Sequence, residues 1–349
     1  MKAAPEPPIG GTLLPIWQRV LKQPSMGAHD NFFDLGGDPA LAVELFSEMA
    51  KECGRELPPL IIYQAPTVAA LAALLEQPFP PRIQPLVLLK AGAGQTPVFM
   101  AHGLGGSVME FFELMKHLHS PHPVYGTQTR GLDGVDGPLE RVEDMAQFGI
   151  DLIQELQPHG PYHLIGYSLG GLVMLEIAQR LSRSGEKIGL LAMLDSYPHL
   201  RHLPPGQRGQ LLIQQMRYRA SGVMQSAIRE SIARIVRPPE RRLQIPEDAN
   251  RSTRHRTPVS LPLAPEMQRA RDSACLAWRS YQPRYYGGAV KFLRAGTRSV
   301  FPANPVAAWG HLIAKLEVET VPGDHLGMIT EHAASLARIL SRYLAESFC

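Results

Sequence analysis

The chain has 349 residues, of which 44% are hydrophobic and 19% are charged. This composition is typical of a soluble globular protein of about two domains, and it excludes collagen, coiled coil and intrinsic disorder. No apolar run reaches the roughly 18 to 20 residues that span a bilayer, and the first residues lack the apolar core of a secretion signal. Three cysteines without CxxC spacing indicate neither a disulfide framework nor a zinc site. We therefore expect a cytoplasmic protein with no membrane partner and no bound metal.

The first 77 residues carry the spacing of short amphipathic helices. Apolar side chains recur with a helical period in Leu13–Lys22 and Leu41–Cys53. A third periodic segment, Val68–Glu76, follows Thr67, which is a favourable N-cap residue. These segments predict a small helical bundle over residues 1–77.

Proline marks the end of this helical region. Residues 77–97 hold five prolines around one apolar stretch, which is the composition of a linker that leads into a strand. We place the domain boundary near Pro78 to Pro85 and interpret 78–96 as a linker and first strand. The second domain is expected over residues 97–349.

The second domain alternates short apolar runs with amphipathic segments, and this alternation predicts a mostly parallel α/β sheet flanked by helices. The strand-like runs are PVFMAH, PVYGTQ, YHLIGY, LLAMLD, AVKFLRA and KLEVETV. Residues 199–272 interrupt the alternation. Because this insertion contains helical pieces such as Gln210–Arg219 and is too long for an ordinary loop, we expect it to form a helical lid.

A GxSxG motif lies where a strand-like run meets a helical one. It reads Gly166-Tyr167-Ser168-Leu169-Gly170, and at such a junction it forms a nucleophile elbow, in which glycines allow a tight turn and the serine hydroxyl is exposed above the sheet edge. The motif alone occurs often by chance, but its position favours Ser168 as a nucleophile.

A serine hydroxyl needs a general base and the base needs an orienting carboxylate, in the order serine, acid, histidine for this kind of sheet. Asp195 ends the run LLAMLD, and His325 follows the last strand-like run, so both lie where catalytic residues of such a sheet belong. Asp324 is a competing acid, but as the neighbour of His325 it would have to fold back on its own backbone. Taken singly, Asp195 could be a turn residue and His325 a surface histidine.

The oxyanion of a tetrahedral intermediate needs two backbone N–H donors. We expect them from Leu169, which follows the nucleophile, and from Leu104 in the glycine-rich loop after the run VFMA. His102 is interpreted as a residue that ends a strand and orders this loop. Its GLGG segment lacks the trailing Lys-Ser/Thr of a phosphate-binding loop, and scattered histidines elsewhere lack metal-ligand spacing.

Residues 86–345 resemble the terminal thioesterase domain of nonribosomal peptide synthetases, a type I thioesterase of the α/β-hydrolase superfamily. The resemblance rests on PVYGTQTRGLDG, QPHGPYHLIGYSLGGLVMLEIAQRL, LLAMLDSYP and VPGDH. It implies that Ser168 accepts the acyl group, that Asp195 and His325 complete a triad, and that residues 199–272 are the lid over the acyl pocket.

The first 76 residues resemble a peptidyl carrier domain, which implies a small all-α domain of four helices. The matching segments are HDNFFDLGGD and YQAPTVAALAALLE. The sequence departs from the family where LGGDS or LGGHS would place the serine that carries phosphopantetheine, because Pro39 stands there. Asp38 followed by Pro39 still suits a helix start, and Ser47 within the helix is no substitute, so we expect a folded carrier-like domain that is not loaded.

These features predict a serine thioesterase that binds no cofactor or nucleic acid itself. The acyl thioester would arrive in trans, on the phosphopantetheine arm of another carrier protein or synthetase module, or as a soluble thioester. Hydrolysis and cyclisation differ only in the second nucleophile. Two alternatives stay open, a non-catalytic docking protein and an esterase that acts on oxygen esters.

The net charge of +3 conceals an uneven distribution. Residues 199–272 hold 14 Arg, no Lys and 6 acidic residues, whereas residues 1–76 hold 5 basic and 9 acidic residues. A solvated helical face explains the arginines most simply. The alternative is that they receive an acidic carrier or the phosphates of its arm or of coenzyme A, since the guanidinium fork suits phosphate.

Overall fold

The computed structural model describes residues 9–78, 81–220, 265–297, 301–302 and 304–348. The chain divides into two compact units between Arg82 and Ile83. The predicted linker, residues 78–96, spans this division. Most of the predicted lid, residues 221–264, lies outside the described residues, and with it lies much of the arginine-rich segment.

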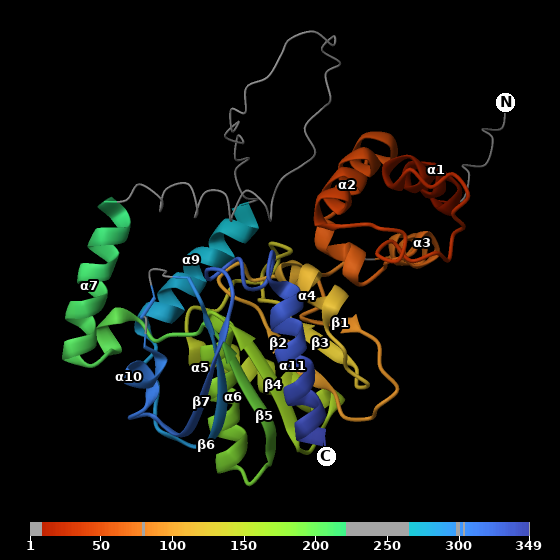
Figure 1. Ribbon diagram of the computed structural model, residues 1–349. Helices are drawn as coiled ribbons and strands as arrows, with labels where there is room; N and C mark the ends of the chain where they lie inside the picture. The colour runs from red at the N-terminus through yellow and green to blue at the C-terminus, as the bar shows by residue number, and fades with distance from the viewer. Residues whose placement is uncertain (1–8, 79–80, 221–264, 298–300, 303, 349) are drawn as a thin grey trace, which may run out of the picture. The chain divides into compact units, whose positions relative to one another are not determined.

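The first unit is all-helical, as predicted (Figure 1). Its helical segments are α1 (Ile9–Leu21), α2 (Pro39–Cys53), the 3-10 helix η1 (Pro59–Tyr63) and α3 (Val68–Leu75). Trp17 and Phe32 pack edge to face in its core with ring centroids 5.6 Å apart, and both side chains are fully buried. Because these rings bury large apolar areas, they contribute strongly to the stability of a small domain.

Helix α2 begins as the sequence predicts. The Asp38 carboxylate accepts the N–H of Leu41 at 2.7 Å, and Pro39 is the first helical residue. An N-cap of this kind stabilises a helix by about 1 kcal/mol, and proline at the first position loses no hydrogen bond. The predicted cap at Thr67 is also confirmed, since its hydroxyl accepts the N–H of Ala70 at 3.1 Å.

The second unit is an α/β domain. Its strands are β1 (Leu86–Lys90), β2 (Val98–Ala101), β3 (Val124–Thr127), β4 (Tyr162–Tyr167), β5 (Ile188–Leu194), β6 (Tyr286–Ala295) and β7 (Ile313–Val321). Its helices are η2 (Val108–Phe111), α4 (Phe112–His117), α5 (Val142–Leu156), α6 (Leu169–Arg183), η3 (Leu200–His202), α7 (Pro205–Ala220), α9 (Pro265–Ser280), α10 (Pro305–Trp309) and α11 (Ala333–Phe348). Each of the strand-like runs named from the sequence overlaps one of these strands.

The strands form one sheet of seven in the order β1-β3-β2-β4-β5-β6-β7. Strand β1 runs antiparallel to β3, and every other neighbouring pair is parallel. The sheet is thus mostly parallel, as predicted. Strands β3 and β4 lie on opposite sides of β2, so the chain reverses its winding direction there. In open α/β sheets such a reversal leaves a crevice outside the carboxyl ends of the strands, where sites form.

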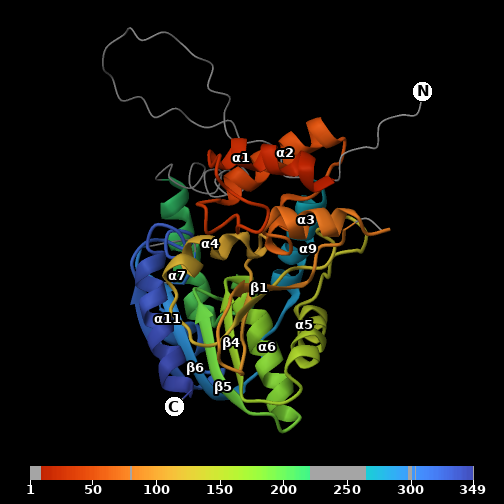
Figure 2. The ribbon, with the colours of Figure 1, turned by 90° about the vertical axis from the view of Figure 1, so that its right-hand side faces the viewer.

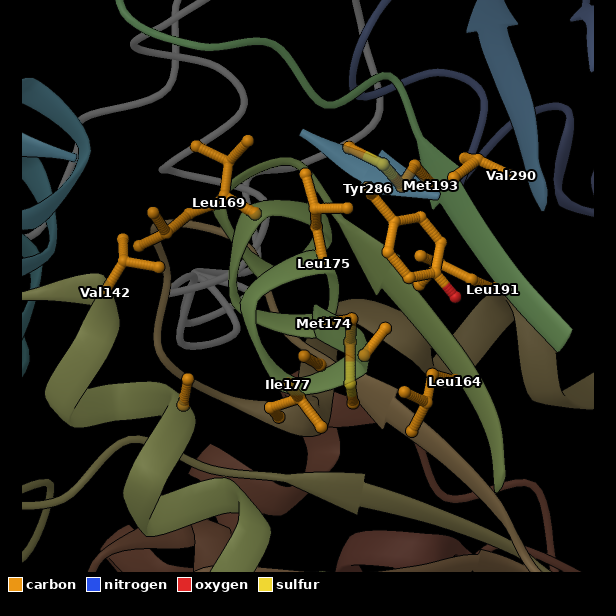
Figure 3. Packing of buried hydrophobic residues seen from close by; sticks show 14 of the residues in the cluster. Val142, Leu164, Leu169, Met174, Leu175, Ile177, Leu191, Met193, Tyr286 and Val290 are labelled. Carbon is orange, nitrogen blue, oxygen red and sulfur yellow. The ribbon is translucent and has the colours of Figure 1, made fainter. Parts of the chain in front are cut away.

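Helices cover both faces of this sheet. Figure 2 shows α11 on one side of the strands and α5 and α6 on the other. A buried cluster fills each interface, and Figure 3 shows part of the cluster beneath α6. The labelled side chains come from α5, α6, β4, β5 and β6: Val142, Leu164, Leu169, Met174, Leu175, Ile177, Leu191, Met193, Tyr286 and Val290. Each buried aliphatic side chain contributes about 2 kcal/mol by leaving water, so α6 is firmly held beneath the nucleophile motif.

Helix α7 and the first half of α9 lie within the predicted lid, residues 199–272. Helix α7 precedes the part outside the described residues and α9 follows it, so the predicted lid boundary at Asp272 falls within α9 and does not coincide with the end of an element. The carboxyl end of α9 is anchored to the sheet domain. Trp278 donates its indole N–H to the Tyr197 carbonyl at 3.0 Å, and the hydroxyl of Tyr281 donates to the buried carboxylate of Glu176 at 3.0 Å. Among the described residues, none of the helices is long and apolar enough to cross a membrane.

Candidate active site

Ser168 occupies the turn between β4 and α6. Its backbone has φ 54° and ψ −118°, a conformation that L-residues rarely adopt and that costs on the order of 1 to 3 kcal/mol. The N–H of Ser168 donates to the Leu194 carbonyl of β5 at 2.9 Å, which ties the turn to the sheet. The side chain therefore projects from a fixed backbone at the carboxyl edge of the sheet.

Two glycines allow this turn because their neighbours leave no room for a side chain. A Cβ atom at Gly166 would overlap the Gly170 carbonyl, and one at Gly170 would overlap the carbonyls of Ala101 and His102. Strand β4, helix α6 and the end of β2 thus approach at backbone contact. The sequence motif predicts this close approach, and the structure shows it.

Asp195 follows β5, the strand next to β4. It also has a positive φ, 46°, and its N–H donates to the Leu293 carbonyl of β6 at 2.8 Å. The carboxylate is 3% exposed. Its Oδ1 accepts the N–H of Ala295 at 3.1 Å, so one oxygen is fixed by the backbone and the other is free to orient a base.

His325 comes from the loop after β7 and is held against the nucleophile motif by Tyr167. The Tyr167 hydroxyl donates to the His325 carbonyl at 2.7 Å, and the two rings stack with centroids 4.9 Å apart. Phe301 contacts the same imidazole with ring centroids 4.5 Å apart. Burial raises the pKa of Tyr167 well above its usual value, so this hydroxyl stays a hydrogen-bond donor at neutral pH.

The three side chains form one chain of hydrogen bonds. The Nδ1 of His325 lies 2.8 Å from Oδ2 of Asp195, and its Nε2 lies 3.0 Å from the Ser168 hydroxyl oxygen. A carboxylate only accepts, so Nδ1 carries the proton and Nε2 is free to accept one from serine. The competing acid, Asp324, instead accepts the N–H of Gly327 at 2.8 Å. The arrangement can deprotonate the serine as a carbonyl is attacked.

The loop after β2 lies beside the nucleophile. A Cβ atom at Gly103 would be 3.2 Å from Cβ of Ser168, and Leu104 follows it with a half-buried side chain that packs on the core. Leu169 is the first residue of α6, where a backbone N–H has no acceptor within the helix. The two predicted oxyanion donors therefore lie in segments adjacent to Ser168, while their role stays a prediction.

Two ionisable side chains hold this loop. The Nδ1 atom of His102 lies 2.7 Å from the Gly103 carbonyl oxygen, and burial lowers the pKa of the His102 imidazole. The N–H of Gly103 donates to the carboxyl group of Glu110, and burial raises the pKa of that group to about 8. The sequence predicts a loop-ordering role for His102, whereas Glu110 is not predicted. Its place in the otherwise apolar run VMEFF was the available signal.

The carrier-like unit shows no substitute for the missing serine at its helix start. Pro39 is the first residue of α2, and Ser47 lies on the exposed side of that helix, two turns further along. Among the described residues of the whole chain, no group of three or more His, Cys, Asp and Glu side chains could hold a metal ion.

Comparison with protein families matches both parts of the chain. Residues 96–344 match the thioesterase domain model, and residues 11–75 match the model of the phosphopantetheine attachment site. The dimodular nonribosomal peptide synthase of Bacillus subtilis (strain 168) is 38% identical over 196 residues, which are 56% of this chain and 8% of that protein. Indigoidine synthase of Dickeya dadantii (strain 3937) is 37% identical over 191 residues, which are 55% of this chain and 13% of that protein. The chain thus spans only a small part of these relatives.

Solved structures share the fold. The four-domain nonribosomal peptide synthetase AB3403, in its holo form bound to AMP and glycine, aligns with 98% of this chain and 26% of its own at 22% identity, with a TM-score of 0.59. The thioesterase domain of NocB from the nocardicin cluster aligns with 72% of this chain and 95% of its own at 19% identity, with a TM-score of 0.51. At these identities the likeness concerns the fold alone.

Proposed function

Since the chain belongs to the thioesterase domain family and joins that domain to a carrier domain of the nonribosomal peptide synthetase type, we propose that it is a serine thioesterase that releases acyl or peptidyl groups from thioesters. The observation that supports this proposal is the hydrogen-bonded chain from Ser168 through His325 to the buried Asp195. A weak nucleophile, its base and the orienter of that base are all in reach of one another, as nucleophilic catalysis requires.

In the proposed cycle, Oγ of Ser168 attacks the thioester carbonyl while Nε2 of His325 takes the hydroxyl proton. The C–S bond then breaks, and the imidazolium returns this proton to the leaving thiolate. Water, or a nucleophile within the acyl chain, then attacks the acyl-serine while His325 takes its proton, and the imidazolium gives that proton to Oγ of Ser168 as the ester C–O bond breaks. Asp195 stabilises the imidazolium, and the N–H groups of Leu104 and Leu169 bind the oxyanion in both halves.

The second part of the proposal concerns the source of the acyl group. Proline has no hydroxyl, so Pro39 cannot carry a phosphopantetheine arm. We therefore infer that the thioester arrives in trans, on the arm of a separate acyl or peptidyl carrier or synthetase module, or as a soluble thioester. The carrier-like unit then serves as a docking or spacer domain.

A fluorophosphonate probe tests the catalytic part, because it phosphonylates only an activated serine. We expect wild-type protein to be labelled and Ser168→Ala to be unlabelled. Ser184→Ala, which changes an exposed serine at the other end of α6, should label like wild type. Absence of labelling in wild type would support a non-catalytic docking protein, and unchanged labelling of Ser168→Ala would overturn the assignment of Ser168 as the nucleophile. Rates on matched thioester and oxygen-ester substrates distinguish a thioesterase from an esterase.

Incubation with coenzyme A and a broad phosphopantetheinyl transferase tests the carrier part by intact mass. We expect no gain in mass for wild type and a gain of one arm for Pro39→Ser, which restores a hydroxyl at the start of α2. A gain of one arm by wild-type protein would show that another residue accepts it. Mass spectrometry of acyl groups removed from separate loaded carriers would then test delivery in trans.

A further inference from the structure

A second carboxyl group contacts the loop that lies beside the nucleophile. Glu110 belongs to η2, a short helix whose other residues, Val108, Met109 and Phe111, are buried. Its Oε1 accepts the N–H of Gly103, and its Oε2 lies 3.7 Å from the position that a Cβ atom of Gly105 would take. The carboxyl group therefore lies against the backbone of the loop after β2.

Gly103 is the residue of this loop that contacts the nucleophile motif. A Cβ atom there would lie 3.1 Å from a ring carbon of Tyr167 and 3.2 Å from Cβ of Ser168. Both polar groups of Gly103 are engaged. Its N–H donates to Glu110, and its carbonyl lies 2.7 Å from Nδ1 of His102 and 3.4 Å from the N–H of Gly106, which donates to it.

These contacts decide the direction of the next N–H group. The Gly103 carbonyl and the Leu104 N–H belong to the same peptide unit, and in a planar trans peptide they point in opposite directions. The Gly103 N–H belongs to the preceding peptide unit, so Glu110 holds one peptide plane at Gly103 while His102 and Gly106 hold the next. Together these contacts fix the direction of the Leu104 N–H. A displacement of about 1 Å in a group that contacts the transition state can cost about a hundredfold in rate.

We propose that Glu110 is a positioning residue for oxyanion binding, which accepts the Gly103 N–H and thereby orients the N–H of Leu104. This inference rests on the proposed function, because it assigns Leu104 as an oxyanion donor. Glu110 acts as a hydrogen-bond acceptor and takes no proton from the substrate.

The chemistry of the carboxyl group agrees with an acceptor role in either protonation state. Burial raises the pKa of Glu110 to about 8, and the Gly103 N–H opposes this shift. A carboxylic acid and a carboxylate both offer an oxygen to an N–H donor. A glutamine amide offers the same oxygen at the same reach, whereas an aspartate is one methylene shorter and an alanine offers none.

The test compares Glu110→Gln, Glu110→Asp and Glu110→Ala by steady-state kinetics on a model acyl thioester and by the rate of fluorophosphonate labelling. We expect Glu110→Ala to lower kcat and the labelling rate by about 10- to 100-fold with little change in KM, since loss of a whole oxyanion donor costs about 100-fold or more. Glu110→Gln should retain most of the wild-type kcat, and Glu110→Asp should lose kcat. Glu113→Ala, which removes an exposed glutamate paired with Lys116 at 2.9 Å, is the matched control.

Wild-type kcat in both Glu110→Ala and Glu110→Asp would overturn the proposal, and so would an equal loss in Glu110→Gln and Glu110→Ala. If Glu110→Ala does not fold, the comparison of Gln with Asp decides the matter alone. These outcomes differ from failure of the proposed function, in which wild-type protein is not labelled at Ser168 at all.

Discussion

The carboxylate of Asp195 should be replaceable by an amide without loss of fold but with nearly complete loss of activity. Its Oδ1 accepts the Ala295 N–H at 3.1 Å and its Oδ2 accepts the His325 Nδ1–H at 2.8 Å. Asparagine has only one oxygen, and the Ala295 N–H is a fixed donor, so in Asp195→Asn the amide oxygen faces Ala295. The NH2 group then faces His325, and Nδ1 must become the acceptor.

This exchange moves the imidazole proton to Nε2, which faces Ser168 at 3.0 Å. The histidine then donates to the serine and cannot remove its proton. A base held in the wrong tautomer lowers kcat by about 10,000-fold, which corresponds to about 5 kcal/mol of transition-state stabilisation. Asparagine tolerates the left-handed conformation of Asp195, φ 46°, so we expect the thermal midpoint to remain near that of wild type.

The assay is steady-state hydrolysis of a model acyl thioester, together with a thermal melt for each variant. Asp324→Asn is the control, because Asp324 accepts the Gly327 N–H at 2.8 Å and an amide oxygen can replace it there. Its kcat should stay close to wild type. An Asp195→Asn enzyme that keeps more than about a tenth of wild-type kcat, or an equal loss in Asp324→Asn, would refute the assignment of the acid.

Three other changes test different parts of the second unit. Gly170→Ala should abolish labelling of Ser168 and lower the thermal midpoint, because its Cβ would overlap the carbonyls at the end of β2; a stable, labelled variant would contradict the close approach. Tyr281→Phe should lower the free energy of unfolding in urea by about 1 to 3 kcal/mol, because it removes the hydroxyl that donates to Oε2 of the buried Glu176 carboxylate at 3.0 Å, while Arg180 keeps its bond to Oε1. Burial lowers the pKa of His163, so the folded state favours its neutral form. This residue should therefore not reduce the free energy of unfolding above the unfolded pKa of about 6.5, and the free energy of unfolding should fall as the pH drops below that value. His163→Gln should weaken this acid sensitivity in thermal melts, and an unchanged pH dependence would contradict it.

The sequence predicted the features that depend on local spacing. The apolar run before Ser168 became β4, and the run before Asp195 became β5, because a fully buried parallel strand must be apolar on both faces. The start of α2 at Pro39 was predictable because an N-cap and a proline act within one turn of helix. Such signals are complete within a few residues.

Features that depend on contacts between distant segments were not predictable in this way. The antiparallel direction of β1 depends on its pairing with β3, and an isolated apolar run carries no direction. The hydroxyl of Tyr167 reaches the carbonyl of His325, which is 158 residues away along the chain. The role of Glu110 is not predictable from the sequence, because only the folded loop shows that the Gly103 N–H needs an acceptor. The choice between Asp195 and Asp324 could be argued from the sequence, since it turned on local geometry.

The two residues with unfavourable backbones at this site, Ser168 and Asp195, follow neighbouring strands whose last residues pair with each other, Tyr167 with Leu194. The sheet therefore stabilises a pair of conformations that neither residue prefers, at a cost of on the order of 1 to 3 kcal/mol each. Glycine adopts a positive φ without this cost. Asp195→Gly would relieve this backbone cost, but it would also remove the acceptor of the buried Ala295 N–H and the partner of His325 Nδ1, a loss of similar size at about 1 to 3 kcal/mol per unpaired buried group. At these two positions the sheet maintains the geometry of the site against the local preference of the chain, so the nucleophile and its acid depend on the integrity of the strands that precede them.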